Sequence, residues 1–413
     1  MKILLASDHY PPFIGGAHRQ VQLLAGELAQ RGYDVSVATV WHGGLPLEAD
    51  EAGVRVYRFK QLRTWLPGSV HDHAQHHQPP FPDPVTVGGL RRLIERIRPD
   101  VVHTYGWLSY SCAAALRGKD IPLVISGRDY GYSCATRSLL FQGQSCSGPA
   151  PLKCLGCASE NYGAAKGLVA VLSLMAGRSL LWPKVRAIHA VSQFVLDVIA
   201  RDFVGADQTR LERNGGPVLE RVIPSFLLDA EEPSTDADFL SQLPAEPFIL
   251  YVGGLQLRKG LAALLEAYAS LQSPPPLVLI GYAASDTPKT FPPGVTVLKN
   301  VSHPNVMRAW ERCSFGVIPS LWPDPSPGVV REAISQGKAL VTTNVGGTPE
   351  MISDGQTGLL VPPGDVVMLT NAMRRLIGDA ALRERLGRAA LGRAHLYRAE
   401  TVIPQFEKLY QLL

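Results

Sequence analysis

The stretch KILLASDHYPPFIGGAHRQVQLLAGELAQRGYDVSVATV, residues 2–40, decides which fold this chain can form. A short apolar run leads into a turn that contains proline and glycine. Val21, Leu24 and Leu28 then recur at helical spacing, and a second apolar run follows. Strand, glycine loop, helix and strand in this order are typical of the opening of a doubly wound α/β domain.

A second, similar half follows the first. The alternation of apolar runs and helical patterns continues until residues 224–247, which are rich in Ser, Pro, Asp and Glu and predict a linker. The segment 248–271, FILYVGGLQLRKGLAALLEAYASL, then repeats strand, glycine loop and helix. The sequence therefore predicts an α/β protein with two Rossmann-like domains, residues 1–223 and 248–395. A C-terminal helix over about 396–413 is expected to pack back onto the first domain.

Length and charge narrow the classes of function. A chain of 413 residues is too long for one ordinary core, and 46% hydrophobic with 18% charged residues is typical of a globular protein. A net charge of +4 suits an anionic small ligand or an acidic membrane surface, and it is too small for a nucleic-acid-binding protein. The N-terminus has no signal-peptide pattern, so we expect a cytoplasmic protein.

Two glycine loops are candidate phosphate-binding turns. Gly15 and Gly16 follow the first strand, where glycine lets the backbone approach a phosphate at a helix N-terminus. On these two glycines alone, a tight turn without a ligand is the stronger interpretation. In the second loop, Arg258 and Lys259 stand at a helix start, where two cations oppose the helix dipole and therefore favour a bound diphosphate.

The stretch 319–365, PSLWPDPSPGVVREAISQGKALVTTNVGGTPEMISDGQTGLLVPPGD, carries the strongest functional pattern. Asp324 lies in a proline-rich loop, and a helix is predicted to begin near Gly328. The free amides at that helix start suit an anion or a polar ligand. Glu332, about one turn into the helix, can accept hydrogen bonds from vicinal hydroxyls such as those of a ribose.

This arrangement resembles the signature of the retaining GT-B glycosyltransferases of family 4, the glycogen-synthase-like group. That family has two acidic residues seven positions apart in a loop and helix, followed by a strand and a GG-x-P-E turn. Asp324-x7-Glu332 and the turn NVGGTPE, residues 344–350, match it here, and both glycine loops match further blocks of the family. The resemblance covers nearly the whole chain and is weakest over about residues 45–95. It implies two Rossmann-like domains that face each other across a cleft.

The resemblance also implies a reaction, the transfer of a sugar from a nucleotide-diphospho-sugar to a glycan, a lipid-linked acceptor or a small metabolite. Lys259 would bind the diphosphate, Glu332 the ribose and Asp324 the transferred sugar. The sequence shows no D-x-D motif beside the donor blocks, so no metal is expected in catalysis. The expected site residues are, for catalysis, Asp324, Lys259, Arg258 and Arg128; for donor binding, Gly15, Gly16, Gly254, Ser326, Pro327, Gly328, Val329 and Glu332; on the acceptor side, His18, Asp129 and His103.

The sequence departs from the family pattern at several positions, His18 among them, and the departures at Gly254 and Arg128 keep another function open. Gly254 stands where the family usually has Arg, and Arg258 is expected to compensate. Arg128 stands where the family often has a sugar-contacting His, and the first acidic residue is Asp324 rather than Glu. A non-catalytic GT-B subunit that assists another transferase therefore remains an alternative, and a nucleotide-sugar epimerase is a weaker one.

Four cysteines are concentrated in one insert with the spacing C-x11-C-x7-C-x2-C, at Cys134, Cys146, Cys154 and Cys157. Three interpretations stay open: a structural zinc held by four thiolates, disulfides, or free thiols. The insert resembles one in a subset of bacterial family 4 enzymes. We expect it to stiffen the loop that displays Arg128 and Asp129.

Two further segments have competing interpretations. The apolar stretch 164–186 is flanked by Lys and Arg, and it predicts either a helix at a membrane interface or a helix packed on the core, the latter being favoured. The segment 71–77 holds four histidines, for which contact with the acceptor or a solvated loop is favoured over metal binding.

Overall fold

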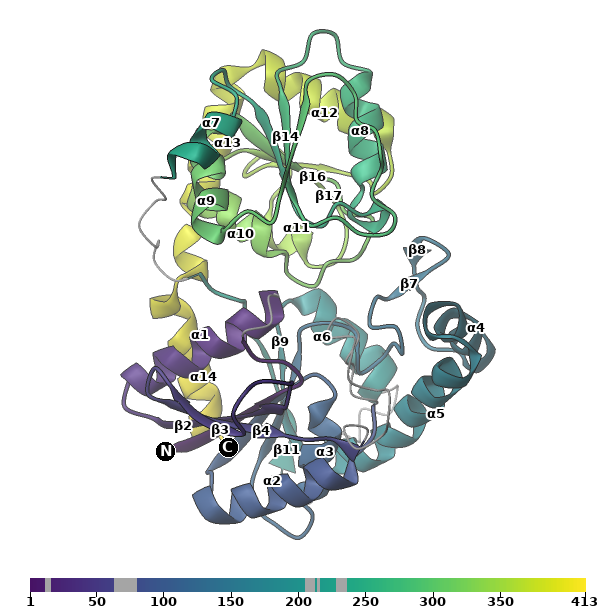
Figure 1. The fold of residues 1–413 in the computed structure, drawn as a ribbon, viewed down its shortest axis with the longest axis vertical. Helices are drawn as coiled ribbons and strands as arrows, with labels where there is room; N and C mark the ends of the chain where they lie inside the picture. Colours follow the sequence, from purple (N-terminus) through teal and green to yellow (C-terminus); the bar gives the residue numbers. More distant parts are fainter. Residues whose placement is uncertain (12–15, 63–79, 205–211, 214–215, 228–235) are drawn as a thin grey trace. The chain divides into compact units, whose positions relative to one another are not determined.

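The computed structural model describes residues 1–413 except 12–15, 63–79, 205–211, 214–215 and 228–235 (Figure 1). The histidine-rich segment 71–77 therefore lies outside the described residues. The chain divides into two compact units. The first comprises Met1–Leu139, Cys146–Pro224 and Val402–Leu413, and the second comprises Leu140–Ser145 and Ser225–Thr401.

The first unit is built on an eight-stranded sheet in the order β12-β9-β6-β5-β1-β2-β4-β3. Neighbouring strands are parallel except β3 and β4, which pair as an antiparallel hairpin. The central strands are buried on both faces, which explains their continuous apolar sequences. The strands are β1 (Lys2–Ser7), β2 (Asp34–Val40), β3 (Glu48–Glu51), β4 (Val54–Phe59), β5 (Val101–Tyr105), β6 (Leu123–Gly127), β9 (Val185–Ala190) and β12 (Leu219–Val222).

Helices follow most of these strands, as a doubly wound fold requires. They are α1 (Gly16–Gln30), α2 (Pro84–Ile97), α3 (Leu108–Ala115), α4 (Pro151–Tyr162), α5 (Ala164–Leu181), α6 (Gln193–Ile199) and α14 (Ala399–Gln411). One small hairpin of this unit pairs β10 (Glu212–Arg213) with β11 (Gly216–Pro217), and a second, β7 (Leu140–Phe141) with β8 (Gln144–Ser145), groups with the second unit.

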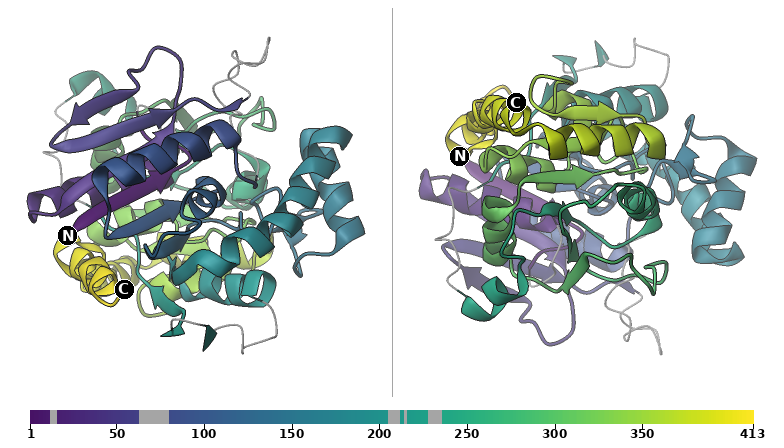
Figure 2. Two further views of the ribbon diagram at one scale, coloured as in Figure 1. Left: turned by 90° about the horizontal axis from the view of Figure 1, so that it is seen from below. Right: turned by 90° about the horizontal axis from the view of Figure 1, so that it is seen from above.

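The helices α4 and α5 form a pair to one side of the first sheet, as the views of Figure 2 show. Two glycines let α5 pack closely on its neighbours. A Cβ atom at Gly167 would lie 2.6 Å from the backbone nitrogen of Ser159 in α4, and one at Gly177 would lie 2.6 Å from the ring of Tyr110 in α3. One face of α5 is thereby fixed to the unit, while Leu168, Val169, Leu172 and Met175 remain exposed.

The second unit contains a six-stranded parallel sheet in the order β15-β14-β13-β16-β17-β18. Its strands are β13 (Ile249–Val252), β14 (Leu277–Gly281), β15 (Val295–Lys299), β16 (Phe315–Ile318), β17 (Leu340–Thr343) and β18 (Leu359–Val361). Its helices are α7 (Ala237–Gln242), α8 (Leu261–Ala269), α9 (His303–Arg312), α10 (Gly328–Ser335), α11 (Thr348–Met351), α12 (Val366–Gly378) and α13 (Ala380–Leu391).

Two apolar clusters fill the two faces of this second sheet. One cluster joins the sheet to α9, α10 and α11 around Trp310, and the other joins it to α8 and α12 around Tyr268 and Met373 (Figure 1). Helices on both faces of a parallel sheet in each unit confirm the predicted α/β class with two Rossmann-like parts.

Candidate active site

The loop before α8 brings Lys259 against Asp324. The Lys259 ammonium donates a hydrogen bond of 2.7 Å to the Asp324 carboxylate, and both side chains keep some exposure, 20% and 15% respectively. Lys259 Nζ also lies 4.3 Å from the centre of the Trp322 ring, with the Arg258 guanidinium at 5.3 Å. The structure therefore gathers three of the four predicted catalytic residues, Asp324, Lys259 and Arg258, around one tryptophan.

Backbone contacts hold these two loops together. The amides of Leu321 and Trp322 both donate to the Arg258 carbonyl at 3.0 Å. Gly260 has a positive φ of 77°, and a Cβ atom there would lie 1.7 Å from the Pro319 carbonyl oxygen. Glycine is therefore required directly after Lys259, both for the left-handed backbone and for the close approach.

The predicted loop and helix after Asp324 form as expected. The helix α10 begins at Gly328, directly after Pro327, and the amide of Ser326 lies 3.4 Å from Asp324 Oδ1. Arg331 is buried and donates to both the carbonyl and the hydroxyl of Ser326, at 3.0 and 2.8 Å. This arginine fixes the turn that presents the free amides of the helix start, and sequence reasoning did not single it out.

The glycine pair of the GG-x-P-E turn closes the same loop from the other side. The amide of Gly347 donates to the Asp324 carbonyl at 2.9 Å, and a Cβ atom at Gly346 would lie 2.4 Å from that carbonyl. The turn is therefore a packing partner of the acidic loop, which explains why the two patterns occur together.

Glu332 projects from α10 toward α9. It accepts a hydrogen bond of 3.2 Å from the indole nitrogen of Trp310, and its other oxygen lies 3.4 Å from His303 Nε2. Neither partner was predicted from the sequence, because both precede Glu332 by more than twenty residues in a separate helix. The two contacts hold the carboxylate in one orientation, as a group that accepts hydrogen bonds from a ligand requires.

Gly254, the departure from the family pattern, has a physical explanation. The Tyr251 hydroxyl donates to the Gly254 carbonyl at 2.7 Å. A Cβ atom at Gly254 would lie 2.9 Å from the Tyr282 ring, so the space beside this glycine is occupied by that tyrosine. Arg258 stacks over Trp322 instead of replacing a side chain at position 254.

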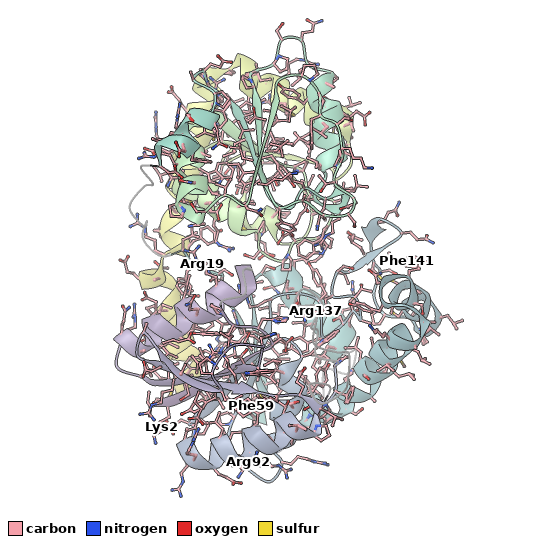
Figure 3. All side chains as sticks on the ribbon, in the orientation of Figure 1. Lys2, Arg19, Phe59, Arg92, Arg137 and Phe141 are labelled. Atoms are coloured by element: carbon pink, nitrogen blue, oxygen red, sulfur yellow. The ribbon has the colours of Figure 1, made fainter. Side chains whose placement is uncertain are left out.

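In the first unit, Arg137 joins two carboxylates at the carboxyl end of the sheet. Its guanidinium donates to Asp129 Oδ2 through Nε at 2.8 Å and through a terminal nitrogen at 2.5 Å, and to Asp8 Oδ2 at 3.3 Å. Asp8 also accepts the amides of Trp107 and Leu108, at 2.9 and 2.6 Å, at the start of α3. Figure 3 labels Arg137 at this edge of the unit.

Asp8 is the most buried member of this network. Burial raises the pKa of Asp8, and the Arg137 charge together with the two amide bonds opposes that rise. Of the network, only Asp129 was predicted; Asp8 follows the first strand directly and could have been noticed as a polar residue at a strand end. Arg137 had no signal of its own, because it reaches Asp8 over 129 positions of sequence.

His103 was predicted on the acceptor side, and the structure corrects this. The residue is fully buried in β5 and belongs to a chain of hydrogen bonds. His189 Nε2 donates to the Ile223 carbonyl at 2.9 Å, so its Nδ1 accepts from the Ser126 hydroxyl at 2.7 Å. Ser126 then accepts from His103 Nε2, and His103 Nδ1 accepts from the Tyr410 hydroxyl, both at 2.7 Å. Both ring nitrogens of His103 are thus used inside the unit.

Arg128, the remaining predicted catalytic residue, lies near this buried network. Burial lowers the pKa of His103, and the neighbouring His189 and Arg128 lower it further. Burial also lowers the pKa of His189 to about 3. The cation is therefore placed beside two neutral histidines. Gly15 and the side chain of His18 lie outside the described residues, and Gly16 is the first residue of α1.

The four insert cysteines are free thiols in this structure. Among the described residues, no group of three or more His, Cys, Asp or Glu is placed to hold a metal. Burial raises the pKa of the Cys157 thiol, and the neighbouring Cys134, Cys146 and Cys154 raise it further, so the four thiols are near one another. Some of the thiols also make local hydrogen bonds; Cys154 Sγ, for example, accepts the amide of Ala150 at 3.3 Å.

Comparison with known proteins agrees with this geometry. The family model for glycosyl transferases group 1 matches residues 236–393, and the model for a glycosyl transferase 4-like domain matches residues 15–215. Glycogen synthase of Mycobacterium tuberculosis is 26% identical over 430 aligned residues, which cover 94% of this chain and 89% of that protein.

Two solved structures show the same two-domain GT-B fold. Sucrose-phosphate synthase from Thermosynechococcus elongatus matches with a TM-score of 0.73 at 20% identity, over 100% of this chain and 98% of that one. Anabaena HepE in complex with UDP-glucose matches with a TM-score of 0.66 at 17% identity, over 100% of both chains. Together with the sequence matches, they favour a transferase over the non-catalytic subunit and the epimerase.

Proposed function

The chain is a glycosyltransferase of the GT-B group, and from this premise we propose that it transfers a sugar with retention from a nucleoside-diphosphate sugar. The observation on which this proposal rests is the ion pair between Lys259 and Asp324, beside Arg258. A bound diphosphate would pair with the Lys259 ammonium in place of Asp324. The Asp324 carboxylate would then be free to accept hydrogen bonds from the sugar. The two cations would then stabilise the leaving diphosphate without a catalytic metal.

UDP-glucose is the first donor to test. The HepE structure is named as a complex with UDP-glucose, and Glu332, held by Trp310 and His303, would accept hydrogen bonds from the two hydroxyls of a ribose. A carboxylate accepting from a diol contributes roughly 1.5–3 kcal/mol. We therefore propose a uridine nucleotide on the second unit, with Glu332 as its ribose ligand.

The test is slow hydrolysis of UDP-, GDP- and ADP-sugars, followed by release of the nucleoside diphosphate. Lys259→Ala should lower turnover about 100–1,000-fold, as loss of one electrostatic stabiliser does. Glu332→Ala should raise the donor KM about 10–100-fold. Lys289→Ala and Glu384→Ala, at exposed positions of the same unit, are matched controls and should behave like the unmodified enzyme. Unchanged rates in Lys259→Ala would overturn the site.

Retention has its own readout. The anomeric configuration of the product, followed by proton NMR from the first turnovers, should equal that of the donor. An inverted product would refute retention while leaving the donor site in place. If no nucleotide sugar is hydrolysed and UDP, GDP and ADP all leave the melting temperature unchanged, the proposed catalytic function is wrong.

We further propose that the enzyme works in the cytoplasm, at a membrane surface. Among the described residues, Ala164–Lys184 is the helix that is long and apolar enough to cross a membrane, and it is 28% buried. The close contacts of Gly167 and Gly177 fix it to the first unit, which favours lying on a bilayer over spanning it. Lys166 and Lys184 near its two ends suit acidic lipids.

Cosedimentation with phosphatidylcholine vesicles, with and without phosphatidylglycerol, tests this proposal. Binding should require the acidic lipid and be lost in Leu172→Arg, which puts a charge on the exposed face of α5. Leu391→Arg, at an exposed leucine of the second unit, should bind like the unmodified protein. Equal binding of both variants would refute the assignment of this face.

A further inference from the structure

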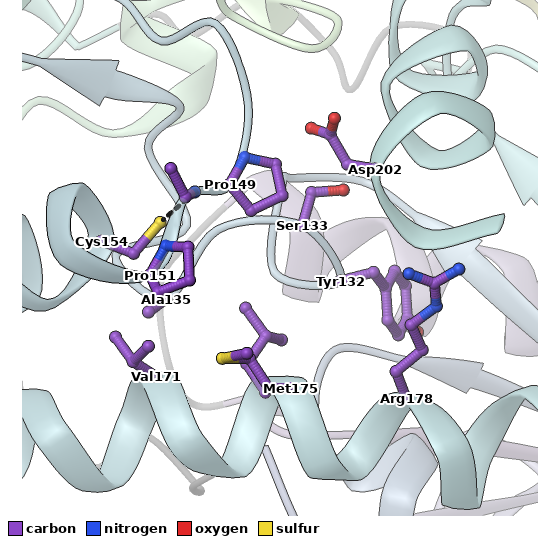
Figure 4. Close-up of a pocket in the computed structure, with 12 residues that line it drawn as sticks. Tyr132, Ser133, Ala135, Pro149, Pro151, Cys154, Val171, Met175, Arg178 and Asp202 are labelled. Atoms are coloured by element: carbon purple, nitrogen blue, oxygen red, sulfur yellow. Dashed lines mark hydrogen bonds between the residues drawn. The ribbon is translucent and has the colours of Figure 1, made fainter. Parts of the chain in front are cut away.

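A cavity of about 300 Å³ lies between the cysteine-bearing insert and α5 in the first unit (Figure 4). Its walls come from residues 132–135, from residues 149–151 with Cys154, and from one face of α5. Val171, Leu174 and Met175 supply the α5 wall, and prolines 149 and 151 stand opposite them. The volume is at the lower end of the range of small-molecule sites, and most of the lining is apolar.

The cavity wall continues into the exposed apolar face of α5. Met175 lines the cavity and is also 56% exposed, and Leu172, nearly one turn earlier, is 55% exposed. A chain that entered the cavity would therefore leave it along an apolar surface rather than across a charged rim.

The opposite wall belongs to the loop that carries the Asp129 and Arg137 network. Tyr132, Ser133 and Ala135 line the cavity, and they stand in the sequence between the two residues of that ion pair. One side of the loop thus presents polar groups at the carboxyl end of the sheet, and the other side presents a mostly apolar cavity. This arrangement matches a molecule with a polar head and an apolar tail.

One polar group in the wall lacks a partner. The Ser133 hydroxyl is buried and has no hydrogen-bond partner among the described residues. The other polar groups are engaged: Arg178 donates to the Val204 carbonyl at 2.7 Å, and Asp202 pairs with Arg201. A buried hydroxyl without a partner is unfavourable, and a polar atom of a bound molecule would relieve it.

We propose that this cavity binds the hydrocarbon chain of a lipid-linked acceptor and so selects that class over free glycans and small metabolites. The inference rests on the proposed function insofar as the ligand is the acceptor. The tail would lie against α5, and a polar atom near the junction of tail and head would meet Ser133. Burial of the chain supplies affinity in proportion to its length.

Chain length is therefore the variable to test. We would measure transfer to methyl, butyl, hexyl and octyl glucosides, each below its critical micelle concentration and without vesicles. The KM for the glucoside should fall about fourfold per added methylene until the cavity is full. Met175→Arg should remove this dependence, because it puts a charge into the wall from a position that is already half exposed. Ala176→Arg, the next residue and an exposed one outside the cavity, is the matched control and should keep it.

Thiol labelling gives a readout that needs no donor and no turnover. Cys154 lines the cavity and Cys157 does not, while both thiols are partly buried. Octyl glucoside should slow the reaction of N-ethylmaleimide with Cys154 at least threefold relative to Cys157, as followed by peptide mass spectrometry, and methyl glucoside should not. Equal labelling of the two cysteines under all conditions would overturn the cavity assignment.

The two experiments separate failure of this inference from failure of the proposed function. Protection of Cys154 without transfer from any nucleotide sugar would support the cavity and refute the reaction. Transfer with a KM that ignores chain length, together with no protection, would support the reaction and refute the cavity.

Discussion

Replacing Arg137 by Met tests the buried network of the first unit. The substitution keeps most of the apolar volume of the side chain and removes the charge that faces Asp8, whose own side chain is 5% exposed. Breaking a buried pair by removing one partner costs about 3–5 kcal/mol. Two amide bonds remain to Asp8, so we expect a loss near the lower end, about 3 kcal/mol in the free energy of unfolding of the first unit.

The loss of stability in Arg137→Met should depend on pH, and the pKa of Asp8 decides in which direction. Burial already raises the pKa of Asp8 above its ordinary value of 3.8, and loss of the Arg137 charge would raise it further. A carboxyl with a raised folded-state pKa contributes its full stability below the unfolded-state pKa and loses it as pH rises through the folded-state pKa. The deficit of Arg137→Met should therefore be smallest at acidic pH, where Asp8 is protonated, and should grow as pH rises.

Denaturant unfolding of the first unit from pH 4 to pH 8 measures this deficit. A 3 kcal/mol loss also corresponds to a fall of about 6–12 °C in melting temperature for a unit of this size. Arg186→Met is the matched control, because Arg186 stands 3.9 Å from a fully exposed Asp120; it should change stability by less than about 1 kcal/mol. A deficit that is the same at all pH values would show that Arg137 acts through packing over Trp107 instead.

Three further predictions follow from single contacts. Gly260→Ala should destabilise the second unit by more than about 3 kcal/mol and abolish donor binding, since its Cβ would overlap the Pro319 carbonyl; denaturant unfolding and a UDP thermal shift check this. Tyr410→Phe should cost the first unit about 0.5–1.5 kcal/mol, measured by calorimetry, because Nδ1 of buried His103 keeps only the longer contact of 3.3 Å with the Tyr105 hydroxyl. Below pH 6.5, His189 alone should lower the free energy of unfolding of the first unit by about 1.4 kcal/mol per pH unit. The reason is that a folded-state pKa of about 3 keeps His189 neutral, while the same residue takes up a proton in the unfolded chain. His189→Gln should make this slope shallower in denaturant titrations.

The sequence predicted the parts of the molecule that depend on neighbouring residues. Strand, glycine loop and helix follow one another in the second unit because Gly260 imposes a local backbone. The seven-residue spacing of Asp324 and Glu332 was equally informative, because a loop and the first turn of a helix place them without distant help.

Contacts over long sequence separations were not predictable. His103 was expected on the acceptor side, yet β5 is buried and its histidine is satisfied by hydrogen bonds inside the unit. The partners of Glu332 come from another helix, and Gly254 makes sense only once Tyr282, 28 positions later, occupies the space beside it. Spacing between cysteines likewise fixes no distance between sulfur atoms.

The insert between β6 and β9 has two structural roles that its cysteines did not indicate. It delivers Arg137 to the carboxyl end of the first sheet, and it supplies the two walls of the cavity that face α5. Lys259, Arg258, Asp324 and Glu332, which we propose to bind the donor, lie by contrast in the second unit. If donor choice depends on the second unit and acceptor choice on this insert, exchange of residues 130–181 between related transferases should change the acceptor and leave the donor KM unaltered.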